Sequence, residues 1–172
     1  MITLDTRIDT NASGDVVAYH HLDVGMGEVK IGARYDLLQA VLGSCVGIGF
    51  IWKKAGRCGL AHCLLPEAPG QICSLGARYV NQAVPSLLKL MRATEDDYAD
   101  IEVILAGGAQ MLHNGSPRFQ VGMLNAVAAK KYLGECGLRL SHCELGGRCG
   151  RRILIDCAQQ SFSVSEISQR RN

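Results

Sequence analysis

The 172-residue chain is long enough to bury a hydrophobic core and is expected to form one domain over residues 1–172, with about residues 1–15 loose. Its net charge of +2 and aromatic content of 5% argue against a nucleic-acid-binding surface. No apolar segment approaches the roughly 20 residues that cross a bilayer. The N-terminus also lacks a secretory signal pattern. These features predict a cytoplasmic protein without membrane insertion.

The cysteine content is high for a protein that is not exported, with eight cysteines in the chain. Disulfides are not expected in the cytoplasm, and the C-x-x-C spacing of zinc ribbons and thioredoxins is absent. Most of the cysteines are therefore expected to behave as small buried hydrophobic residues. A zinc site assembled from scattered side chains is the less favoured alternative; it would use Cys136, His142, Cys143 and Cys149. We predict no metal and no cofactor.

The first part of the chain contains short apolar or alternating segments that predict strands over residues 16–21, 25–32 and 37–42. A bend at Gly43-Ser44 follows. Residues 41–66 then hold two apolar runs joined by the polar, glycine-containing turn KKAGR. This arrangement predicts a β-hairpin.

The second part alternates helical and strand patterns. Apolar spacing predicts a helix over 74–92, capped by Ser74 and kinked at Pro85. Residues 101–106 form an apolar, β-branched run typical of a buried strand, and Gly107-Gly108 follow it. A second helix is expected over 121–134, with its buried side made by Leu124, Val127, Ala128 and Leu133.

The C-terminal segment alternates again and predicts three strands in a meander. The order of elements is strands, helix, strand, helix, strands. This order indicates an α+β fold: a mixed or antiparallel β-sheet sandwich with about two main helices packed outside.

The predicted hairpin carries Cys45 at its start and His62 near its end. A thiol with a nearby imidazole is the minimal set for a nucleophile and its base. A free thiol has a pKa of about 8.5, so it needs such help at neutral pH. Gly43 and Ser44 permit an abrupt bend, and backbone N–H groups near Cys45 would form an oxyanion hole.

A structural interpretation of the same residues stays open, because a cysteine in an apolar strand is usually part of the core. A simple two-residue hairpin register pairs His62 nearer Ile48 than Cys45. The bend at Gly43-Ser44, or a bulge, must then bring the Cys45 thiol close to His62. Spacing alone does not decide between the two interpretations.

The segment LGSCVGIGF followed by GLAHCLLP resembles the active-site region of CheD-type chemoreceptor glutamine deamidases. The similarity extends through ARYVNQAVPSLLKLM, ILAGGAQML and VGMLNAVAAKKYLGECGLRL to GGRCGRRILIDCAQQSFSV. It covers residues from about 24 to 166. The combination of segments is specific, although each one alone is weak.

The resemblance implies a cofactor-independent cysteine hydrolase that converts glutamine side chains of chemotaxis receptors to glutamate. Cys45 would attack the carboxamide carbon to form a thioester, and His62 would transfer protons. The partners implied are the cytoplasmic helices of methyl-accepting chemotaxis receptors and a CheC-type phosphatase. An alternative is that the chain acts mainly as a non-catalytic binding regulator of such a phosphatase.

The chain departs from the family pattern at Gln39, where the family has a threonine six positions before the cysteine. A glutamine carbonyl could accept a hydrogen bond from the imidazole, as the third member of a triad does. Ser44 or a backbone carbonyl could take that role instead. A second departure is Glu144, which replaces a common aspartate and is expected to support the Gly-rich turn. Nearby, Arg148, Arg151 and Arg152 would either be solvated or help to dock the receptor helix.

Overall fold

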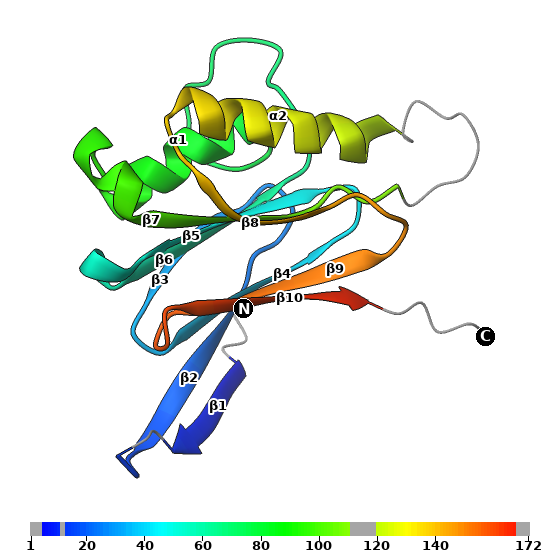
Figure 1. The fold of residues 1–172 in the computed structure, drawn as a ribbon. Coiled ribbons are helices and arrows are strands. Elements are labelled where there is room, and N and C mark those ends of the chain that lie inside the picture. Colours follow the sequence, from blue (N-terminus) through cyan, green and yellow to red (C-terminus); the bar gives the residue numbers. More distant parts are fainter. Residues whose placement is uncertain (1–4, 11–12, 111–119, 168–172) are drawn as a thin grey trace, which may run out of the picture.

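The computed structural model describes residues 5–10, 13–110 and 120–167. Within this part of the chain, ten strands form two five-stranded sheets that face each other. Two α-helices cover the outer face of one sheet (Figure 1). The predicted α+β sandwich with two outer helices is confirmed.

The first sheet has the order β1-β2-β4-β9-β10. Its strands are antiparallel to their neighbours except for β2 and β4, which run parallel. The bounds are β1 Asp5–Thr10, β2 Val16–Asp23, β4 Asp36–Leu42, β9 Gly150–Asp156 and β10 Ser161–Ile167. Strand β1 lies within the stretch that was expected to be loose. It is ordered because β2 supplies an antiparallel partner for its backbone groups.

The second sheet has the order β3-β6-β5-β7-β8. Its bounds are β3 Val29–Ala33, β5 Val46–Trp52, β6 Arg57–Cys63, β7 Ile101–Gly107 and β8 Leu140–Leu145. The predicted hairpin is β5 and β6. The predicted C-terminal meander is wrong, because β8 pairs parallel to β7 in this sheet, whereas β9 and β10 belong to the other. Strand β8 covers the β7 edge that the hairpin leaves unpaired.

The helices are α1 Val80–Met91 and α2 Val121–Glu135, with short 3-10 turns η1 Lys53–Ala55 and η2 Glu95–Asp100. Helix α1 begins six residues later than predicted, and Tyr79 rather than Ser74 is its N-cap. The preceding backbone is held extended, because the N–H groups of Leu64 and Leu65 both donate to the carbonyl of Arg78. Gln82 instead donates its side-chain amide to Ser74. None of the helices in the described residues is long and apolar enough to cross a membrane.

Helix α2 buries only part of the predicted face: Ala128 and Leu133 are buried as predicted, but Leu124 and Val127 are not. Leu124 and Val127 are 44% and 60% exposed, while the side turned inward carries Gly122, Asn125, Ala128, Ala129 and Leu133. Small residues let α2 approach the sheet closely. A methyl group on Gly122 would lie only 2.7 Å from the carbonyl oxygens of Gly108 and Ala109. The start of α2 therefore rests directly on the segment that follows β7.

Candidate active site

The register of the β5–β6 hairpin decides whether Cys45 and His62 share a face of the sheet. His62 pairs with Gly47, one residue away from the predicted partner Ile48. This register is centred on the four residues, 53–56, that separate the paired Trp52 and Arg57. Since side chains alternate along a strand, Cys45, Gly47 and His62 all point to one side. Pairing with Ile48 would have put His62 on the opposite face from Cys45.

The shared face of Cys45 and His62 is turned toward the first sheet. A methyl group on Gly47 would lie 2.8 Å from Leu42 Cδ1, so the two sheets are in close contact there. Cys45 and His62 are only 6% and 5% exposed. Cys45 lies two residues before Gly47, the partner of His62, at the bend that precedes β5. The predicted nucleophile and base therefore lie buried at the same end of the hairpin, and their roles stay a prediction.

His62 is held by the segment between β2 and β3. Its Nδ1 lies 2.9 Å from the carbonyl oxygen of Val24. Its backbone N–H donates to the backbone carbonyl of Glu28, and its backbone carbonyl accepts the N–H of Gly27. Because a carbonyl only accepts hydrogen bonds, Nδ1 must carry the proton in the neutral ring. Nε2 is then the basic nitrogen, as a general base requires.

Gln39 lies beside this support. Its side-chain amide donates to Asp23 Oδ1 at 2.6 Å, and its backbone carbonyl accepts the N–H of Val24 at 2.8 Å. Gln39 thus binds Val24, whose carbonyl contacts His62, and the side chain of Asp23 before it. The predicted role of Gln39 as third member of a triad stays a prediction.

The Cys45 thiol lies at the bend that precedes β5. Burial raises the pKa of Cys45 above the ordinary thiol value, and its own backbone N–H partly opposes this shift by donating to the sulfur. The resting side chain is therefore a neutral thiol at pH 7. On the C-terminal side, the Cys45 carbonyl accepts the N–H of Gly108 at 2.8 Å.

The bend itself is fixed by Gly107 and its neighbours. Gly43 accepts a hydrogen bond from the N–H of Ala109, at 2.9 Å. Gly107 has a φ of +103°, and a methyl group there would lie 2.3 Å from the Cys45 carbonyl oxygen. Only glycine fits this position.

Asn125 of α2 is a site residue that the sequence analysis missed. It is fully buried, and its Nδ2 lies 3.1 Å from both the Ser44 and Leu64 carbonyl oxygens. These carbonyls come just before Cys45 and two residues after His62. The helical periodicity placed leucine and valine on the buried side of α2, so the pattern gave no signal for an inward asparagine.

Glu28 adds a negative charge close to the imidazole. The N–H of Gly25 donates to its carboxylate and is the largest reason that the pKa of Glu28 is lowered, with smaller contributions from Lys30 and His62. Glu28 is exposed and also lies 3.2 Å from Nζ of Lys30.

The Gly-rich turn after β8 is supported by an arginine rather than by Glu144. Arg151 is only 8% exposed, and its Nη1 donates to the Gly146 carbonyl at 2.6 Å. Arg151 is therefore not a solvated side chain. Glu144 instead lies 2.7 Å from Nε2 of His142. Glu144 thus has a different neighbour from the predicted one, because β8 turns its side chain toward His142.

The alternative zinc site does not form from the described residues, among which no three His, Cys, Asp or Glu side chains gather closely enough to hold a metal ion. Cys143 is exposed, and Cys136 and Cys149 are half-buried.

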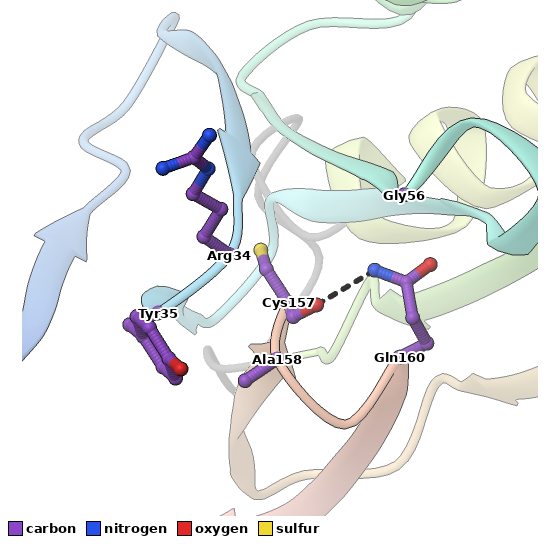
Figure 2. A pocket seen from close by; sticks show the side chains of 6 residues that line it. All are labelled: Arg34, Tyr35, Gly56, Cys157, Ala158 and Gln160. Carbon is purple, nitrogen blue, oxygen red and sulfur yellow. Dashed lines mark hydrogen bonds between the residues drawn. The ribbon is translucent and has the colours of Figure 1, made fainter. Parts of the chain in front are cut away.

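Two surface hollows lie near the two ends of the β5–β6 hairpin. One, of about 360 Å³, begins at Gly108 and includes Lys130 and Arg148 on its rim. The other, of about 510 Å³, is lined by Arg34, Tyr35, Gly56, Cys157, Ala158 and Gln160 (Figure 2). The first adjoins the Cys45 bend through Gly108, whereas the second lies at the far end of the β5–β6 hairpin.

Comparison with known proteins gives consistent matches. The family model described as CheD chemotactic sensory transduction matches residues 64–166. A protein of Ruegeria sp. (strain TM1040) called probable chemoreceptor glutamine deamidase CheD 2 is 37% identical over 171 residues, covering 89% of this chain and 96% of the relative.

Two further relatives carry the name probable chemoreceptor glutamine deamidase CheD. The protein of Bdellovibrio bacteriovorus is 38% identical over 150 residues, covering 86% of this chain and 94% of its own length. The protein of Pyrococcus abyssi is 36% identical over 150 residues, covering 85% and 91%. The chain belongs to the CheD family.

Proposed function

We propose that this protein is a protein-glutamine deamidase that converts glutamine side chains of chemotaxis receptors to glutamate. The observation that carries the proposal is the shared face of Cys45 and His62, with Nδ1 of the imidazole held by the Val24 carbonyl. The names of the relatives agree with this activity. The enzyme acts in the cytoplasm, where the receptor helices lie.

The nucleophile is Cys45 and the base is His62. Because burial keeps Cys45 protonated at rest, its proton passes to Nε2 of His62 as the sulfur attacks the glutamine carboxamide carbon. A thiol kept neutral until substrate arrives also reacts slowly with other electrophiles.

The reaction continues through a tetrahedral intermediate, whose oxyanion is stabilised by the backbone N–H of Cys45. Its collapse breaks the C–N bond, and His62 returns the proton so that ammonia leaves. The thioester on Cys45 is then attacked by water, from which His62 removes a proton. Glutamate is released and the thiol is restored, without a cofactor.

Gln39 acts indirectly in this scheme. It positions the Asp23-Val24 segment, and the Val24 carbonyl takes the orienting role that a triad acid has in other hydrolases.

The substrates are cytoplasmic receptor helices, which expose glutamine and glutamate on a polar surface. Lys130 and Arg148, on the rim of the hollow that begins at Gly108, are placed to contact acidic residues that flank a target glutamine. A CheC-type phosphatase is the proposed second partner, binding to the same protein.

The test is deamidation of a purified receptor cytoplasmic fragment, followed by peptide mass spectrometry. We expect the mass increase that results from replacing an amide NH₂ by OH at selected glutamines. Cys45→Ala and His62→Ala should both abolish it. An unmodified fragment, under conditions where a control deamidase works, would refute the enzymatic proposal. Binding of a CheC-type phosphatase by the same inactive protein would then favour the regulator alternative.

A further inference from the structure

We infer that Asn125 is a positioning residue for the reaction at Cys45: its side-chain amide fixes the Ser44–Cys45 peptide so that the Cys45 N–H faces the reacting centre. The inference rests on the proposed deamidase function. It assigns to α2, which carries neither the nucleophile nor the base, a direct part in forming the oxyanion hole.

The orientation of the Asn125 amide follows from its neighbours. The atom placed as Nδ2 lies 3.1 Å from two backbone carbonyl oxygens, those of Ser44 and Leu64. Carbonyl oxygens only accept hydrogen bonds, so the donor end of the amide must face them. Both N–H bonds of the amide are used, one for each carbonyl.

The two carbonyls lie where the hairpin ladder ends. The last β5–β6 pair is Val46 with Cys63, and the next positions outward are Cys45 and Leu64. The Leu64 N–H already donates to Arg78. Asn125 therefore joins the ends of the strands that carry the nucleophile and the base, at a point where the ladder gives them no further bond.

The consequence for Cys45 comes from peptide geometry. The described chain contains no cis peptide bonds, so the Ser44 carbonyl and the Cys45 N–H point in opposite directions. Because Asn125 holds the carbonyl toward α2, the N–H points away from α2. It donates to the Cys45 sulfur, beside the carbon that the sulfur would attack. Gly108 holds the carbonyl on the other side of Cys45 at 2.8 Å.

A requirement for two donors explains an otherwise costly choice of residue. Asn125 is completely buried, and its Oδ1 has no hydrogen-bond partner among the described residues. An unpaired buried acceptor is destabilising, so packing alone would favour an apolar side chain. An asparagine suits this position because its two N–H groups donate to the carbonyls of Ser44 and Leu64.

The experiment compares two reactions of the same thiol in Asn125→Ala and Asn125→Asp. Deamidation of the receptor fragment passes through an oxyanion, whereas alkylation of Cys45 by iodoacetamide does not. We expect kcat for deamidation to fall about 10- to 100-fold with little change in KM, because the oxyanion donor is misdirected. The alkylation rate should stay within about twofold of the wild type.

Gln82→Ala is the matched control. Gln82 is also a buried amide on a helix, donates to a backbone carbonyl at 3.1 Å and leaves its own oxygen unpaired among the described residues. It binds Ser74 rather than the strands of the site. We expect its kcat to stay within about twofold of the wild type, whatever stability is lost.

The possible outcomes separate the inference from the proposed function. A wild-type protein without deamidase activity refutes the function itself. An active wild type with unchanged kcat in both Asn125 variants overturns only the role of Asn125. A parallel fall in deamidation and alkylation, or failure of both variants to fold by circular dichroism, makes Asn125 a packing residue and also overturns it.

Discussion

The two ends of the β5–β6 hairpin each have buried cysteines at the interface between the sheets, with different surroundings. At one end Cys45 shares a face with His62, and Asn125 and Gly108 hold the neighbouring carbonyls. At the other end Cys58 lies near Cys157, and Gln160 donates to the sulfur of Cys58. Gln160 also donates to the carbonyl of Cys157 (Figure 2). Burial of a thiol therefore does not by itself mark the candidate active site in this protein. The residues around the thiol are what differ between the two ends.

The electrostatic environments of the two ends differ in kind. The pKa of Cys157 is raised first by its hydrogen bond with Cys58 and then by burial, so its proton is held by another thiol. The pKa of Cys45 is raised by burial alone, and a backbone donor opposes the shift. His62 lies at the Cys45 end of the hairpin, whereas the charged neighbours of Cys157 are the carboxylates of Asp36 and Asp156. Substituting and alkylating both cysteines in the same way should therefore show which of them is catalytic and which one only packs.

The largest expected difference comes from removing each thiol. Cys45→Ala should lower deamidation of a receptor fragment by about 10⁴-fold or more, because the nucleophile is lost. Cys157→Ala should change the rate by less than about threefold and mainly reduce stability. Steady-state rates and thermal unfolding of both variants check this. Comparable losses of activity would mean that Cys45 has no special role.

Two glycines allow the same comparison for the backbone. Gly107→Ala should lower the free energy of unfolding by about 3 kcal/mol or more, because φ is +103° and the methyl group would meet the Cys45 carbonyl at 2.3 Å. Gly56→Ala, at φ +60° with no atom within 4 Å, should cost only about 1 kcal/mol. Urea unfolding measures both. Equal values would show that the close approach at Gly107 is relieved without cost.

The pH dependence of alkylation tests the state of the two thiols. Below its pKa, the thiolate fraction of a cysteine rises about tenfold for each pH unit. Since burial raises the pKa of Cys45 above that of an ordinary thiol, its reaction with iodoacetamide should still increase through pH 9 in the folded protein. Cys157 should react more slowly throughout. Mass spectrometry of the two peptides follows both rates. A plateau for Cys45 near pH 7 would reveal a thiolate already formed at rest and contradict the neutral-thiol mechanism.

The smallest effect is expected at Gln39. Gln39→Ala removes a 2.6 Å hydrogen bond to Asp23 and should lower kcat about fivefold, since Val24 keeps its carbonyl but loses part of its support. Lys54→Ala is the control, because it also breaks a 2.6 Å bond to a carboxylate, that of Asp100, at the far end of the hairpin. Its kcat should not change. A loss above about 100-fold in Gln39→Ala would instead point to direct contact with His62 during turnover.

Much of the architecture followed from local patterns, because hairpins and buried strands are encoded by short-range alternation and turn residues. Strands β5, β6 and β7 and helix α2 were predicted with small errors at their ends, whereas helix α1 begins six residues later than predicted. The pairing of β8 with β7 was not, since the connection between them contains α2 and the partner lies far away in sequence. Local patterns carry no information about which of two sheets a strand will join.

The site was predictable only where side chains do the chemistry. Cys45 and His62 could be chosen from the sequence, but their shared face depended on a one-residue difference in hairpin register. The carbonyl of Val24 was hidden because backbone atoms look alike in every residue. Asn125 was hidden because helix α2 exposes leucine and valine and turns a polar side chain inward.

The contacts of Asn125 also bear on when the protein becomes active during folding. Cys45 and His62 lie on one hairpin and meet through local pairing, which forms on the microsecond timescale. Asn125 is 81 residues from Ser44 and 61 from Leu64, so its bonds close only when α2 docks on the completed sheet. A nascent chain would hold a thiol and a base before it holds an oriented oxyanion donor. Deamidase activity would then appear last, after the protein has reached its native packing.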